Sequence, residues 1–130
     1  PELIKALNAV KFSFNSYTMN RTSISYGIES VNDKEYFEEC VGKIVKTREN
    51  AKESLSQLGF SFPDSKANFI FATHKSVSAK EIFEKLKEKN IFVRYFNQPL
   101  IDNYFRITIG TDEQMEKLYA ALEEITGQVK

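Results

Sequence analysis

The alternation of apolar and polar residues predicts short strands in the second half of the chain. Phe105, Ile107 and Ile109 alternate with polar residues and would therefore share one face of a strand. Two further runs contain the aromatic and β-branched residues that are typical of strands. The pattern predicts three strands, over residues 68–73, 91–96 and 104–109.

Apolar residues spaced three and four positions apart predict helices in the remaining segments. Capping boxes, which mark helix starts, lie at Asn32–Glu35, Ser78–Glu81 and Thr111–Gln114. Gly59 and Asn90 suit the left-handed position that follows a helix. The predicted helices run from Pro1 to about Val10, from Arg21 to near Val31, from Asp33 to Leu58, from Ser78 to about Lys89, and from Thr111 to Gly127.

The longest predicted helix carries apolar residues along its whole length. A helix of this length must lie across the whole face of a small domain. The apolar stripe consists of Tyr36, Phe37, Cys40, Val41, Ile44, Val45, Ala51, Leu55 and Leu58.

From residue 60 onward the predicted order is strand, helix, strand, strand, helix. This order predicts an α+β fold, with a small, mainly antiparallel sheet and helices packed on one face. A helical N-terminal segment precedes it.

Arg94 and Arg106 are the candidate functional residues. Each lies on a predicted strand, on the face opposite the more aliphatic one, with the aromatic residues Phe92, Phe96 and Tyr104 around them. A guanidinium group can donate two parallel hydrogen bonds to one anion. The pattern indicates a site for a carboxylate or a phosphate, while the residues alone are equally compatible with a surface role for both arginines.

Composition argues against several other classes of function. The 18 basic and 18 acidic residues cancel, so there is no electrostatic footprint for nucleic acid, and no apolar stretch approaches the ~20 residues that span a membrane. One His and one Cys argue against a zinc site built by protein ligands. We interpret His74 and Cys40 as structural residues, and no residue of this chain is predicted to be catalytic.

Beyond these patterns, several segments closely resemble the C-terminal region of the histidinol-phosphate aminotransferases. The segments are Ala67–Phe71, Phe92–Phe96 and Asp102–Thr111, together with Pro1–Leu7 and Phe14–Tyr17 near the start. These enzymes belong to the fold-type I family, which depends on pyridoxal phosphate. The resemblance covers essentially the whole chain, in the expected order.

The resemblance implies a domain organisation and roles for particular residues. Residues 1–31 would be a helical linker at the end of the large cofactor domain, and residues 32–130 would be the C-terminal small domain. The arginine matching Arg106 binds the substrate's anionic group, and the one matching Arg94 is expected to assist with a phosphate. Asn15 and Tyr17 would lie at the edge of the active site.

The resemblance also implies a larger parent protein. The chain begins at Pro1 without Met, and none of its lysines lies in the family's Ser-x-x-Lys setting, so we expect the lysine that binds pyridoxal phosphate to lie upstream. The fragment alone should neither bind the cofactor nor catalyse transamination. Its expected partners are a small phosphate or carboxylate substrate, the large domain of the same chain and a second subunit of a cytosolic homodimer, with no nucleic acid and no membrane.

Three alternatives remain open, and one of them is a purely structural interaction domain in which Arg94 and Arg106 bind no ligand. A threonine-phosphate decarboxylase would share the architecture and also bind a phosphate, although the Asn97–Pro99 loop and the Arg106–Gly110 string favour the aminotransferase. A stand-alone module that binds a small anion without catalysis would also explain the paired arginines.

Overall fold

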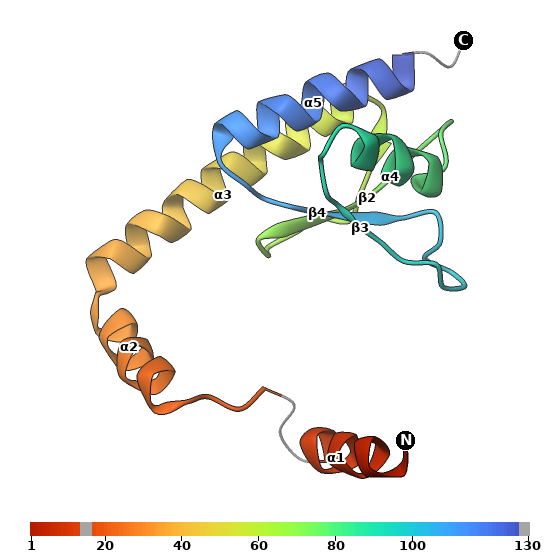
Figure 1. Cartoon of the computed structure of the whole chain (residues 1–130). Coiled ribbons are helices and arrows are strands. Elements are labelled where there is room, and N and C mark those ends of the chain that lie inside the picture. Colours follow the sequence, from red (N-terminus) through yellow and green to blue (C-terminus); the bar gives the residue numbers. More distant parts are fainter. Residues whose placement is uncertain (14–16, 128–130) are drawn as a thin grey trace. The chain divides into compact units, whose positions relative to one another are not determined.

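The structure of this chain is a computed structural model that describes residues 1–13 and 17–127 (Figure 1). These residues form two compact units, which are divided between Glu39 and Cys40. The boundary after residue 31 that the sequence suggests concerns the intact protein, and it stays a prediction.

The N-terminal unit contains the helices α1 (Glu2–Phe12) and α2 (Arg21–Asn32), both close to their predicted bounds. Asn20 caps α2, because its Oδ1 accepts a hydrogen bond of 2.8 Å from the backbone N–H of Ser23. The described residues of this unit are almost all exposed to solvent.

The long helix α3 (Lys34–Gln57) begins one residue later than its predicted capping box. Asp33 Oδ1 accepts a hydrogen bond of 3.2 Å from the backbone N–H of Tyr36, so Asp33 rather than Asn32 supplies the cap. Glu35 therefore lies one position too early to complete a box. The prediction of the box was wrong because both Asn and Asp favour the capping position and they are adjacent here.

The C-terminal unit contains a four-stranded antiparallel sheet with the order β1-β2-β4-β3. The α+β class is confirmed. The strand β1 was not predicted, because its two residues are too few to show an alternating pattern. The strands are β1 (Phe60–Ser61), β2 (Phe69–His74), β3 (Arg94–Tyr95) and β4 (Phe105–Thr108).

Two more helices, α4 (Ala79–Glu88) and α5 (Asp112–Gly127), begin at their predicted caps. Ser78 Oγ accepts from the backbone N–H of Glu81 at 3.2 Å. Thr111 and Gln114 bond each other's backbone N–H groups at 3.3 and 2.9 Å, which is a reciprocal capping box. The left-handed positions were also predicted correctly, with φ of +85° at Gly59 and +60° at Asn90.

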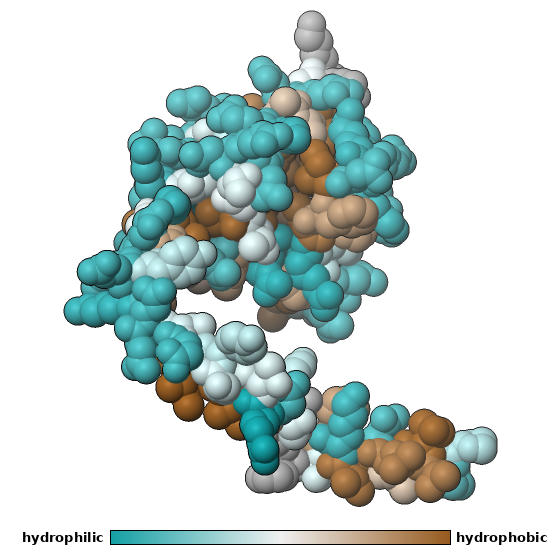
Figure 2. All heavy atoms as spheres, turned by 60° about the vertical axis from the view of Figure 1, so that its left-hand side comes forward, coloured by the Kyte–Doolittle hydropathy of each residue, from teal (hydrophilic) through white to brown (hydrophobic). Residues whose placement is uncertain are grey.

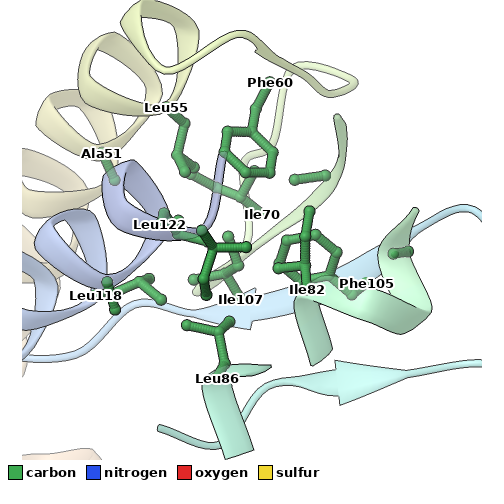
Figure 3. Packing of buried hydrophobic residues seen from close by; sticks show 14 of the residues in the cluster. Ala51, Leu55, Phe60, Ile70, Ile82, Leu86, Phe105, Ile107, Leu118 and Leu122 are labelled. Carbon is green, nitrogen blue, oxygen red and sulfur yellow. The ribbon is translucent and has the colours of Figure 1, made fainter. Parts of the chain in front are cut away.

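The helices α3, α4 and α5 pack on one face of the sheet, and the core lies between them and the strands (Figure 3). Alternate residues of β2 and β4 point into this core, and for β4 this agrees with the predicted faces. The fully buried large side chains are Leu55, Ile70, Ile82, Leu86, Phe105, Ile107, Leu122 and Ile125. The other face of the sheet is left without a covering helix from this unit (Figure 1).

The prediction that the long helix lies across the whole face of the domain holds for only part of the length of α3. In this helix Thr47, Arg48, Ala51 and Leu55 are buried, whereas Tyr36 and Phe37 are 63% and 60% exposed. Apolar residues of α1 and α2 are also exposed, and Figure 2 shows hydrophobic side chains at the surface of the N-terminal unit. The spacing of apolar residues shows that a helix has an apolar face. It does not show whether the residues that cover this face belong to this chain segment or to another part of the protein.

Candidate anion-binding face

Arg94 and Arg106 occupy directly opposed positions on neighbouring antiparallel strands, β3 and β4. Residues paired in this way project from the same face of a sheet. Phe71, on β2, is paired with Arg106 from the other side, so three adjacent strands each contribute one side chain to this row. The face is the one opposite the hydrophobic core, as the alternation in the sequence predicted.

Neither arginine has an acidic partner among the residues that the structure describes. Arg94 is exposed, while Arg106 is half-buried. The Nε of Arg106 is buried and has no hydrogen-bond partner within the described part of the chain. A buried donor without a partner costs free energy, and the cost is larger for a charged group. The face therefore presents two positive charges and one unsatisfied donor that an anion could bind.

Aromatic rings lie beside Arg94 and Arg106, in positions where carboxylates are often found next to arginines. The Cζ of Arg106 lies 5.2 Å from the ring centroid of Phe69, and the Cζ of Arg94 lies 5.5 Å from that of Phe96. Both distances are within the range of about 6 Å for an attractive cation–π contact.

The rings also contact one another. The ring of Phe71 stacks on that of Tyr104, with centroids 4.8 Å apart, and meets the ring of Phe96 edge-on at 5.9 Å. Such offset and edge-on arrangements are the favourable ones for aromatic pairs. The two arginines thus project beside a connected aromatic surface.

The aromatic neighbours differ in part from those that the sequence indicated. Phe96 and Tyr104 are present as expected, but Phe92 is 75% exposed and lines a separate apolar groove of about 400 Å³ with Val93 and Met115. Phe69 and Phe71 come from β2 and were not assigned to the site. Alternation alone could place them on one face of β2, but the register between β2 and β4 was needed to bring them to Arg106.

Asn103 fixes the end of the loop that joins β3 to β4. Its Nδ2 donates a hydrogen bond of 3.1 Å to Thr73 Oγ1 on β2, and its Oδ1 accepts one of 3.4 Å from the backbone N–H of Ala79 at the start of α4. This residue therefore ties the start of the Tyr104–Arg106 segment to two neighbouring elements.

The two remaining predicted site residues lie in the N-terminal segment. Asn15 falls outside the described residues. Tyr17 is 91% exposed and belongs to the N-terminal unit, whereas the arginines belong to the C-terminal one. The role of both residues at an active-site edge stays a prediction.

His74 is a structural residue in this fold. Its Nδ1 accepts hydrogen bonds from the backbone N–H groups of Ser76 and Val77, at 3.3 and 3.1 Å, so the proton lies on Nε2, which donates to the carbonyl of Leu58 at 3.2 Å. Burial lowers the pKa of His74, and the charge of Lys75 acts in the same direction while the Leu58 carbonyl opposes it. Both ring nitrogens are engaged, which leaves none available for catalysis.

Two further features are absent from residues 1–13 and 17–127. No group of three or more His, Cys, Asp or Glu side chains in these ranges could hold a metal ion. No helix within them is long and apolar enough to cross a membrane.

Comparison with known families gives a match over most of the chain. The model of the family described as aminotransferase class I and II matches residues 1–122. A histidinol-phosphate aminotransferase of Brachyspira hyodysenteriae is 54% identical over 114 residues, which is 88% of this chain and 32% of that protein. One of Clostridium botulinum (strain Okra) is 47% identical over 128 residues, covering 98% of this chain and 36% of that protein.

Two solved structures show the same fold. The histidinol-phosphate aminotransferase of Clostridium acetobutylicum superposes with a TM-score of 0.78 at 23% identity, over 92% of this chain and 37% of that one. The Sinorhizobium meliloti enzyme, in complex with pyridoxal-5'-phosphate, gives a TM-score of 0.78 at 23% identity, over 94% and 34%. The chain spans about a third of the length of the curated relatives that it matches.

Proposed function

The chain belongs to the aminotransferase class I and II family, and we propose that it is the C-terminal small domain of a histidinol-phosphate aminotransferase. The intact protein would transfer an amino group between L-histidinol phosphate and 2-oxoglutarate, in histidine biosynthesis. The curated relatives described above, which carry this name at 54% and 47% identity, support the proposal.

We propose that this domain binds the anionic group of the substrate. The main support is that Arg94 and Arg106 are paired across two strands and have no acidic partner among the described residues. A phosphate has oxygens enough to accept hydrogen bonds from both guanidinium groups at once. Arg106, which is half-buried and has an unsatisfied Nε, would bind the anion most tightly. Arg94 is more exposed and would add a second set of charged hydrogen bonds.

The arginine-bearing face lacks one part that a complete pyridoxal phosphate site needs. The strands β2, β3 and β4, which form the arginine-bearing face, contain no lysine to bind the cofactor's aldehyde. In the intact protein we place that lysine, and the cofactor, in the two-thirds of the relatives' length that this chain does not span. Bound there, the cofactor would supply the electron sink for the amino transfer.

The exposed apolar residues of α1, α2 and the first residues of α3 indicate that another protein surface covers the N-terminal unit. Exposed large apolar side chains in this number on one small unit are typical of an interaction surface. We propose that the large domain of the same protein covers these apolar side chains.

We also propose that the intact protein is a cytoplasmic homodimer. Analytical ultracentrifugation of the intact protein tests the dimer, and a monomer at micromolar concentration would contradict it.

The experiment that tests the proposed function is the Arg106→Gln substitution in the intact protein. We expect kcat/KM for the phosphorylated substrate to fall by about 10- to 150-fold, which corresponds to roughly 1.5–3 kcal/mol for a lost hydrogen bond to a charged group. Lys46→Gln removes a positive charge from an exposed position on α3 and serves as the control. A value of kcat/KM for Arg106→Gln equal to that of the control would refute the assigned role.

A further inference from the structure

Within the described part of the chain, aromatic rings and not carboxylates contact the guanidinium groups of Arg94 and Arg106. A carboxylate beside an arginine fixes its orientation, but it also neutralises the charge and competes with an incoming anion. An aromatic ring attracts the cation through its quadrupole and leaves the full charge and the N–H donors available. A ring is therefore the better support for an arginine that must bind an anion.

Phe69 is the ring that supports Arg106. It lies on β2, is half-buried, and its centroid is 5.2 Å from the Cζ of Arg106. Phe69 is paired with Thr108, which lies two residues after Arg106 on β4. Phe69 therefore projects from the same face of the sheet as Arg106. The half-buried position of Arg106 weakens competition from water, which strengthens a cation–π contact.

The same arrangement occurs a second time on this face. Phe96 lies 5.5 Å from the Cζ of Arg94, and its own ring is held edge-on by Phe71. The repetition indicates that support by rings is a property of the site and not a chance contact of one side chain.

We propose that Phe69 is a positioning residue for Arg106, which holds the guanidinium group in place with its charge intact for the bound anion. This inference rests on the proposed function, because it gives Phe69 its role through the anion that Arg106 binds. Phe69 would not itself touch the reacting atoms.

The test uses inorganic phosphate and the intact protein, with binding measured by isothermal titration calorimetry. Phe69→Leu removes the ring and keeps an apolar side chain, and we expect it to weaken phosphate binding by about 2- to 30-fold. Phe69→Tyr keeps the ring and should bind phosphate within about twofold of the wild type. Phe83→Leu is the matched control, because Phe83 is also half-buried but stacks on Tyr95, away from both arginines.

A double substitution separates positioning from a general structural effect. When Arg106 is already Gln, changing Phe69 to Leu should not weaken phosphate binding further, because Phe69 would act only through Arg106. Equal weakening by Phe69→Leu with and without Arg106 would overturn the inference, as would phosphate binding by Phe69→Leu at the wild-type level. If Arg106→Gln binds phosphate like the wild type, the proposed function fails together with the inference. If Arg106→Gln weakens binding but Phe69→Leu does not, the inference alone fails.

A spectroscopic measurement on the unsubstituted protein tests the same contact without relying on the Leu variant to fold. The Nε–H resonance of Arg106, assigned by its loss in Arg106→Gln, should be displaced by the ring current of Phe69 and should move again when phosphate is added. Phe69→Tyr should retain the displacement. A resonance at the position of an exposed arginine, unmoved by phosphate, would contradict the contact.

Discussion

Arg94 and Arg106 face each other across β3 and β4, so the free protein holds two positive charges in directly opposed positions. Like charges placed opposite each other destabilise a sheet. The described residues provide no carboxylate to offset this repulsion, and the aromatic rings attract the cations without neutralising them. The arrangement is consistent with a face that is shaped for a ligand at some cost to the stability of the free protein.

Removing one of the two charges should therefore stabilise the free protein. We expect Arg94→Gln to raise the free energy of unfolding by about 0.2–1 kcal/mol, measured by urea denaturation without added anions. With phosphate added, the wild type should become more stable than Arg94→Gln. A ligand that binds only the folded state stabilises the protein that binds it more tightly, which is the wild type.

The control for this measurement is Lys46→Gln, which removes an exposed charge that has no opposed arginine. It should change the free energy of unfolding by less than about 0.5 kcal/mol. Sodium chloride at matched ionic strength separates binding of phosphate from screening. A destabilised Arg94→Gln in the absence of anions would show that repulsion between the two arginines is not the dominant interaction.

His74 should make the stability of the C-terminal unit depend on pH. Burial lowers the pKa of His74 from its ordinary value of 6.5, so the unfolded chain binds more protons than the folded chain and stability rises with pH. The contribution is fully present above the ordinary value and is lost as the pH falls through the lowered one. A protonated Nδ1 also cannot accept the hydrogen bonds from Ser76 and Val77.

The measurement is urea denaturation between about pH 8 and pH 5, above the range in which ordinary carboxylates titrate. The pKa of Asp64 is lowered to about 2 by its hydrogen bonds with Lys52 and Lys66, so this carboxylate stays ionised throughout. We expect stability to fall toward pH 5 in the wild type, and to fall less steeply in His74→Gln. The same slope in both proteins would show that another group is responsible.

Much of the C-terminal unit could be predicted because its signals are local. The capping residues Thr111 and Gln114 are three positions apart and their bonds form whenever the helix forms. The shared face of Arg94 and Arg106 followed from the twofold period of strands. These inferences need no knowledge of distant parts of the chain.

The features that could not be predicted depend on the register between strands or on which other segments of the protein cover a surface. Phe69 reaches Arg106 only because β2 pairs with β4 in one particular alignment, and no local pattern fixes that alignment. Tyr36 and Phe37 belong to an apolar period, but their exposure depends on which other segments are present to cover them. The substrate role of Arg106 likewise depends on the intact protein and stays a proposal.

Leu100 offers a test of strain in the loop between the two arginine-bearing strands. It has a φ of +73°, a left-handed conformation that leucine rarely adopts, and its side chain is 95% exposed. Replacing Leu100 by Asn removes almost no buried apolar surface. It relieves part of the backbone strain, which costs about 1–2 kcal/mol, so we expect the unfolding free energy to rise by up to about 1 kcal/mol.

Gly59→Ala provides the contrast to Leu100→Asn. Gly59 also has a positive φ, of +85°, but a Cβ there would lie 3.1 Å from Lys75 Cε and 3.2 Å from His74 Nε2. We expect this substitution to lower the unfolding free energy by about 1 kcal/mol or more, because it introduces the strain that Leu100→Asn removes. Thermal denaturation of both variants beside the wild type should therefore move their midpoints in opposite directions. A fall in the midpoint for Leu100→Asn would show that contacts of the leucine side chain in the intact protein outweigh the strain in its backbone.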